Sequence, residues 1–141
     1  MAEQRVGSQR IKGAYAWRTF LDQGSRIACG SDFPVESPNP FFGIHAAVTR
    51  QDAAGKPAGG WHADQAMTLK EAFRCFTIDA AWAAHQEKAL GSLETGKWAD
   101  FIVIDQDLFK MAPKDIHKTA VLQTWVAGKQ VYNKGQGDQN K

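Results

Sequence analysis

The sequence predicts a mixed α/β fold, and three observations carry that prediction. Apolar residues recur at helical period in residues 9–23 and again in residues 68–85. Short apolar runs bounded by turn residues occupy residues 26–30 and 100–105, as in buried strands. Two β-rich runs, 121–126 and 130–132, flank residues 127–129 and predict a hairpin. Helices and strands therefore alternate along the chain.

The N-terminal half is predicted to contain a helix, a strand, a loop and a second helix. The helix of residues 9–23 ends before Gly24, because glycine is typical of helix C-termini. The strand of residues 26–30 follows. Residues 31–40 hold three of the five prolines, which cannot donate ladder hydrogen bonds, so this segment is predicted to be a stiff loop. A short helix is expected over residues 42–51, followed by a glycine-rich surface loop, 52–65.

The C-terminal half begins with the strongest local signal. Thr68 and Glu71 have the spacing of a capping box, in which both side chains bind N–H groups at a helix start. The helix is expected to continue to about residue 85. After it come the strand of residues 100–105, one or two helical turns at 113–118, and the hairpin. Residues 134–141 are polar and predict a solvated tail.

Composition limits the classes of function. The chain has 141 residues, 43% of them hydrophobic, which suffices for one globular domain. Its net charge is only +2 and its basic residues are scattered, which argues against nucleic acid as the main partner. No signal-peptide core and no apolar run of ~20 residues occur, so no membrane association is expected. Cys29 and Cys75 form no metal spacing and no disulfide framework, which favours a reduced, cytoplasmic setting.

Asp32 closes the predicted strand of residues 26–30 and has two interpretations. In sheets covered by helices, ligands and catalytic groups collect at the carboxyl ends of strands. An aspartate before a proline-containing loop is also ordinary turn chemistry, in which the carboxylate accepts backbone N–H bonds. The residues of this stretch leave both interpretations open.

No complete active site follows from spacing alone. The four histidines, His45, His62, His85 and His117, lack the i,i+2 or i,i+4 spacing of paired metal ligands, which favours packing or surface roles. Only His62 stands out, because its glycine-rich loop could overhang a site. A Ser/His/Asp motif, a phosphate-binding glycine loop and a Cys-x-x-Cys motif are all missing from the sequence.

Two long stretches resemble the amidohydrolase family 3 branch of the metal-dependent hydrolases, which have a TIM-barrel fold. They are FTIDAAWAAHQEKALGSLETGKWADFIVIDQD, residues 76–107, and KGAYAWRTFLDQGSRIACGSDFPVESPNPFFGIHAAVTRQ, residues 12–51. The resemblance spans roughly residues 5–132. It implies a partial TIM-barrel end in residues 1–85, comprising the last helix–strand–helix unit with the active-site loop and a closing helix. It further implies β-sandwich strands in residues 86–133 and a flexible tail, 134–141.

The resemblance also assigns a role to Asp32. In this family the aspartate that closes the last barrel strand lies at the metal centre and helps to deprotonate the attacking water. Both the catalytic and the metal-ligand roles therefore fall on Asp32. Residues expected to surround the substrate, which would be a small amide-type molecule, are Phe33, Pro34, Glu36, Ser37, Asn39 and His62. The complete enzyme is expected to hold a divalent metal, with zinc as the expected ion.

The sequence departs from the family pattern in one important respect. An eight-stranded barrel needs ~250 residues, and the family's His-x-His pair, later histidines and bridging ligand have no counterpart here. We therefore interpret the chain as a C-terminal portion that is inactive and binds no metal tightly on its own. Two alternatives remain open: a complementing module that docks onto a separate N-terminal barrel portion, and an inactive structural remnant. Exposed strand edges would favour self-association in each case.

Overall fold

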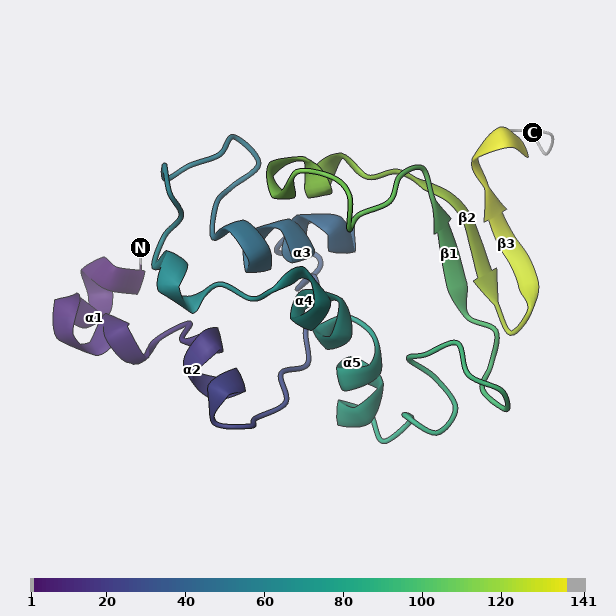
Figure 1. Cartoon of the computed structure of the whole chain (residues 1–141), viewed down its shortest axis with the longest axis horizontal. Coiled ribbons are helices and arrows are strands. Elements are labelled where there is room, and N and C mark those ends of the chain that lie inside the picture. The colour runs from purple at the N-terminus through teal and green to yellow at the C-terminus, as the bar shows by residue number, and fades with distance from the viewer. Residues whose placement is uncertain (1, 137–141) are drawn as a thin grey trace.

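The computed structural model describes residues 2–136, with the helices at one end of the molecule and a small sheet at the other (Figure 1). The helices are α1 Ala2–Arg10, α2 Trp17–Asp22, α3 Pro40–Thr49, α4 Leu69–Cys75 and α5 Ile78–Ala83, and the strands are β1 Phe101–Ile104, β2 Val121–Val126 and β3 Lys129–Asn133. Four short 3-10 helices are η1 Ile11–Gly13, η2 Ala63–Gln65, η3 Pro113–Lys118 and η4 Lys134–Gln136. The mixed fold and the helical turns at 113–118 are thus confirmed.

Helix α3 lies at the centre of the hydrophobic core. Asn39 starts the helix, because its side-chain oxygen accepts a hydrogen bond from the N–H of Phe41 at 3.0 Å, and Pro40 occupies a first-turn position that needs no N–H donor. Phe41 is only 1% exposed. The other buried members of the core come from α3, α4, η3 and the loops beside them: Ile44, Ala47, Met67, Ala72, Cys75, Leu108 and Ile116.

The sheet has the order β1-β2-β3 with antiparallel pairing throughout. Phe101 lies opposite Trp125, and their rings stack with centroids 5.5 Å apart. Ala127 and Gly128 join β2 to β3 with φ values of 49° and 74°, as a two-residue hairpin with two left-handed residues requires. The predicted strand at 100–105 and the terminal hairpin are therefore confirmed.

Two predicted helices are broken in the structure. The helix expected over residues 9–23 is replaced by the end of α1, by η1 and by α2, because Tyr15 has a φ of 55° and interrupts the helical backbone. The helix expected over residues 68–85 is divided into α4 and α5 at Thr77, whose φ of −127° and ψ of −98° are not helical. Its start is confirmed, because Thr68 and Glu71 form the capping box.

The predicted strand of residues 26–30 is wrong. This segment is extended, but it pairs with no strand in residues 2–136. An apolar run predicts extended backbone from local preferences, whereas a strand also needs a partner with unpaired backbone groups. The barrel end and the sandwich consequently stay predictions, since the described residues show one three-stranded sheet.

The expectation that the cysteines form no disulfide is also wrong. Cys29 and Cys75 are joined by a disulfide, and their Cα atoms lie 5.0 Å apart. They are 46 positions apart in the sequence, so no short-range motif predicts that they pair. Packing of the extended segment against α4 brings them together.

Two further expectations concern membranes and the C-terminus. Within residues 2–136, no helix combines the length and the apolar character that a membrane crossing needs. In the predicted tail, residues 134–136 form η4, and residues 137–141 lie outside the described part of the chain.

Candidate functional site

The segment that carries Asp32 is held to the helices at one backbone position. Residues 25–30 run extended from α2 past α4 toward α3 (Figure 1). Ile27 and Cys29 are partly buried and pack against the core. The N–H of Cys29 donates to the carbonyl of Cys75 at 2.9 Å. In the described chain, this is the one backbone hydrogen bond between residues 26–31 and another element, and the disulfide lies at the same place.

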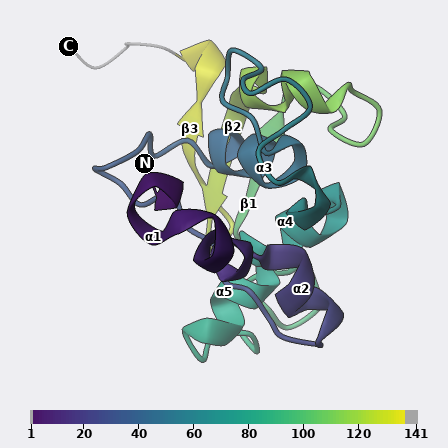
Figure 2. The ribbon, with the colours of Figure 1, turned by 90° about the vertical axis from the view of Figure 1, so that its left-hand side faces the viewer.

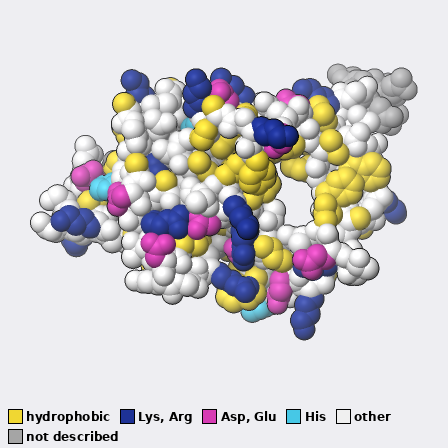
Figure 3. All heavy atoms as spheres, in the orientation of Figure 1, with side chains coloured by type: hydrophobic (Ala, Val, Ile, Leu, Met, Phe, Trp, Pro, Cys, Tyr) yellow, Lys and Arg dark blue, Asp and Glu magenta, His cyan; other side chains and the backbone are white. Residues whose placement is uncertain are grey.

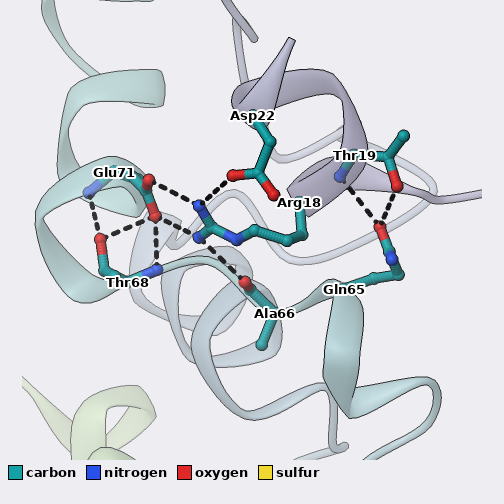
Figure 4. Close-up of polar contacts among 7 residues, drawn as sticks. All are labelled: Arg18, Thr19, Asp22, Gln65, Ala66, Thr68 and Glu71. Atoms are coloured by element: carbon teal, nitrogen blue, oxygen red, sulfur yellow. Dashed lines mark hydrogen bonds and ion pairs between the residues drawn. The ribbon is translucent and has the colours of Figure 1, made fainter. Parts of the chain in front are cut away.

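A network of charged groups ties α2, which precedes this segment, to α4 (Figure 4). Arg18 donates to both carboxylate oxygens of Glu71, at 2.9 and 2.5 Å, and also to the carbonyl of Ala66 at 3.2 Å. Glu71 further accepts from the N–H of Thr68 at 2.8 Å and from its hydroxyl at 2.7 Å. The hydrogen bonds from Arg18, and to a lesser extent those from Thr68, lower the pKa of Glu71 to about 2. The pair therefore stays ionised and fixes α2 against α4.

Asp32 lies at the start of a turn. Its carbonyl accepts hydrogen bonds from the N–H groups of Val35 at 2.8 Å and Glu36 at 3.3 Å. Its φ is 58°, in the left-handed region that aspartate tolerates better than most residues. The side chain is exposed, and within residues 2–136 its carboxylate makes no hydrogen bond or ion pair. Asp32 thus lies in a turn, but its carbonyl and not its carboxylate accepts the backbone N–H bonds, so the carboxylate remains available for another group.

The rest of the predicted substrate loop projects from the body of the molecule before α3 (Figure 2). Phe33 is 65% exposed, and Pro34 and Glu36 are also exposed. Ser37 and Asn39 instead have local structural roles. The hydroxyl oxygen of Ser37 accepts from the N–H of Asn39 at 3.3 Å, and Asn39 in turn caps α3.

His62 lies in an aromatic cluster. Its ring meets that of Trp61 edge-on, with centroids 4.4 Å apart. The guanidinium of Arg50 lies over the rings of both Trp17 and Trp61, at 4.3 and 5.1 Å from their centroids. Arg50 also donates from Nε to the carbonyl of Trp61 at 3.0 Å. Across residues 2–136, no hydrogen bond or ion pair joins His62 to Asp32. The structure therefore does not bring these two predicted site residues into contact.

A complete metal site is not present in the described part of the chain. Residues 2–136 hold no group of three or more His, Cys, Asp or Glu side chains that could bind one ion. Zinc sites need three or four such ligands. Asp32 could supply one carboxylate, but the residues around it do not fit a metal centre by themselves.

Sequence reasoning missed a contact between two histidines, of which one is buried. His45 of α3 is 2% exposed, and its ring lies edge-on to His117 of η3, with centroids 4.8 Å apart. Burial, and secondly the nearby His117, lower the pKa of His45. The apolar face of residues 42–51 predicts burial of position 45, but nothing in the sequence pairs it with position 117, which is 72 positions later.

Comparisons with known proteins agree on one family. The profile of the amidohydrolase family, in its family 3 branch, matches residues 1–132. The putative amidohydrolase YtcJ of Bacillus subtilis is 32% identical over 130 residues, which make up 92% of this chain and 25% of that protein. An N-substituted formamide deformylase of Arthrobacter pascens is 36% identical over 111 residues, covering 79% of this chain and 20% of the deformylase.

One solved structure supports the same fold. A crystal structure of an amidohydrolase from Thermotoga maritima superposes with a TM-score of 0.55 at 24% identity, covering 85% of this chain and 26% of that one. The chain thus spans about a quarter of the length of the relatives that it matches.

Proposed function

This chain belongs to amidohydrolase family 3, and from that premise we propose that it supplies one part of a metal-dependent hydrolase acting on an amide or another C–N bond. The match over residues 1–132 supports the class of reaction. The name of one relative, an N-substituted formamide deformylase, supports an amide-type substrate, because a formamide is an amide.

The position of Asp32 carries this proposal. Its carboxylate is exposed at the end of a segment that is anchored to α4 beside the disulfide. Within the described residues it has no hydrogen-bonding partner, so it is available to accept a proton or to bind a cation. In the complete enzyme, Asp32 would hold the metal and accept a proton, while Phe33, Pro34 and Glu36 would border the substrate.

The metal would need ligands from outside residues 2–136. Because Asp32 is not surrounded by further His, Cys, Asp or Glu ligands in this part of the chain, we assign no catalytic step to these residues alone. The chain by itself is therefore expected to be inactive and to hold no stoichiometric metal. The remaining ligands would come from the part of an amidohydrolase that this chain does not match.

A second candidate function, a module that docks onto such a complementary polypeptide, is favoured by the surface of the fold. The accessible surface is 9777 Å², whereas a compact monomer of 15.5 kDa is expected to expose about 7,200 Å². The difference, about 2,600 Å², is as large as one side of a large permanent interface buries. The fold thus exposes more surface than a self-sufficient domain of its size.

An apolar cleft lies between the helices and the sheet. The cleft has a volume of about 350 Å³. Figure 3 shows hydrophobic side chains on both sides of this hollow. Those that line it include Phe41, Phe73, Phe76, Phe101, Ile102 and Trp125. Contacts with another polypeptide are one of the uses of exposed apolar surface. Strands β1 and β3 are both edges of the sheet and could extend such a contact.

The test is a chimera in which this chain replaces the matching segment of the Arthrobacter pascens relative. Turnover of an N-substituted formamide would be measured with added zinc for the chimera, for the chimera with Asp32→Asn, and for the 141-residue chain alone. Glu3→Gln is the matched control, because Glu3 is an exposed acid in α1 far from the loop in sequence. General-base effects predict a loss of about 100- to 10,000-fold for Asp32→Asn and no change for Glu3→Gln.

Each result bears on one part of the proposal. Unchanged turnover in the Asp32→Asn chimera, with an unchanged melting temperature, would refute the catalytic role. Zinc-dependent turnover by the short chain alone would refute the need for further ligands. A folded chimera whose activity survives loss of Asp32 would leave docking as the function of this chain.

A further inference from the structure

The disulfide occupies the point at which the Asp32 segment is anchored. Cys29 lies three residues before Asp32 in an extended segment without strand partners. Its partner Cys75 ends α4, which is fixed by the Arg18–Glu71 pair. The covalent bond therefore joins a weakly held segment to a firmly held helix.

The reduced state of this pair is also accommodated. The sulfur of Cys75 lies 3.1 Å from the carbonyl oxygen of Ala72, which can accept a hydrogen bond from the thiol when the disulfide is open. The thiol of a reduced Cys75 would thus be satisfied although the residue is only 2% exposed. The packing around Cys75 is therefore compatible with both the disulfide and the free thiol.

A groove of about 370 Å³ leads to the disulfide between the extended segment and α4. Cys75 and Ile27 line it, together with the cations Arg26, Lys70 and Arg74 and the acids Glu71 and Asp79. Glu71 is neutralised by its ion pair with Arg18. Arg74 is paired with Asp79 at 3.0 Å, but within residues 2–136 neither Arg26 nor Lys70 belongs to an ion pair. The groove therefore presents excess positive charge beside a sulfur, which attracts anions and favours thiolates.

We propose that Cys29 and Cys75 form a thiol–disulfide exchange site for an anionic low-molecular-weight thiol that enters through this groove. The incoming thiolate attacks one sulfur, which breaks the protein disulfide, forms a mixed disulfide and releases the other cysteine as a thiolate that takes up a proton. A second small thiolate then resolves the mixed disulfide. The protein disulfide is reduced to two thiols, and two small thiols are oxidised to one small disulfide; the reverse reaction restores the bond.

Opening the disulfide loosens the loop that carries Asp32. Without the covalent bond, one backbone hydrogen bond and the side chains of Ile27 and Cys29 hold residues 26–31 to the core. The redox state then sets how well Asp32 is positioned. Only this consequence for catalysis rests on the proposed function, because the exchange itself needs no activity of the loop.

Titration with reduced and oxidised glutathione tests the exchange on the whole 141-residue chain. Thiol counting and intact mass should show no thiols and a mass lower by about two hydrogens in oxidised glutathione, and two thiols in reduced glutathione. Two thiols that persist in oxidised glutathione would overturn the proposal, as would a disulfide that reduced glutathione never opens.

The groove is tested by exchange rates. Lys70→Gln should slow reduction by glutathione several-fold and leave reduction by the cationic thiol cysteamine unchanged or faster. Lys114→Gln is the matched control, because Lys114 is an exposed lysine on η3 outside the groove. Equal glutathione rates for Lys70→Gln and the unaltered chain would refute entry through the groove.

The loop is tested by limited proteolysis at residues 31–39, a measurement that does not use hydrolase activity. Cleavage of the unaltered chain should accelerate several-fold on reduction. A variant with Cys29→Ser and Cys75→Ser should be cleaved at the fast rate with or without reductant. Cleavage at the same rate in both redox states of the unaltered chain would refute the coupling between the disulfide and the loop, even if Asp32 is catalytic.

Discussion

Removing the charge of Glu71 should weaken the contact between α2 and α4. The pKa of Glu71 is held at about 2 against a usual value of 4.5, and each pKa unit corresponds to about 1.36 kcal/mol. The upper limit is therefore about 3 kcal/mol of folding free energy at pH 7. Because the Arg18 and Glu71 side chains are 25% and 30% exposed, solvent screening reduces this to about 1–2 kcal/mol.

The assay is a double-mutant cycle with Glu71→Gln and Arg18→Met, measured by urea unfolding. Glutamine keeps the shape of the side chain and can still accept the hydrogen bonds from Thr68, so the cycle isolates the charged pair. The folded-state pKa is lowered, so the stabilisation is fully present above pH 4.5 and is lost as the pH falls toward 2. The exposed pair Lys110–Asp107, probed with Lys110→Met and Asp107→Asn, is the control and should give no measurable coupling.

Two outcomes would contradict this reasoning. A coupling energy near zero at pH 7 would show that the ion pair between Arg18 and Glu71 does not stabilise the fold. A coupling that keeps its full size at pH 2, where the carboxylate becomes protonated, would show that it does not come from the ion pair.

Three further predictions concern the core and the backbone, and each is checked by unfolding midpoints. Phe41→Ala should destabilise the fold by about 3–5 kcal/mol, because a fully buried ring leaves a cavity; a cost below 1 kcal/mol would contradict its place in the core. Burial lowers the pKa of His45, so stability should fall as the pH drops below 6.5, and His45→Phe should remove that part of the pH dependence. Gly60→Ala should cost clearly more than Gly24→Ala, since both have positive φ but the added Cβ at position 60 would lie 2.6 Å from the carbonyl oxygen of Thr49; equal costs would refute the clash.

Local signals predicted the elements whose formation depends on neighbouring residues. The two partners of the capping box, Thr68 and Glu71, lie within one helical turn, so a local motif identifies both. The structure contains this capping box. The hairpin is equally local, because Ala127 and Gly128 supply the left-handed turn between two β-rich runs.

Two helices fail through the local backbone at Tyr15 and Thr77, whereas the other failures involve partners that are distant in sequence. Residues 26–30 have the pattern of a strand but no strand beside them in residues 2–136. Arg18 meets Glu71 across 53 positions, and Cys29 meets Cys75 across 46. Tertiary packing creates these contacts, and neither composition nor periodicity encodes them.

The candidate site is predicted less completely than the fold. The sequence singles out Asp32, and its exposed carboxylate at the end of an extended segment fits that hypothesis without testing it. The sequence singles out His62 for its loop; in the structure its ring packs beside Trp61, and a substrate role for it stays a prediction. Ser37 and Asn39 shape the loop and the start of α3, so a substrate role for them remains a prediction.

The apolar cleft beside the sheet also governs how stability should vary with temperature. The heat capacity increment of unfolding grows with the apolar area that unfolding exposes, and a compact chain of 141 residues should show about 1.7–2.1 kcal/mol/K. Because the folded chain already leaves this cleft in water, its increment should be smaller and its stability curve flatter. A polypeptide that fills the cleft would remove the same area from water, so their association should carry a negative heat capacity change and grow weaker on cooling.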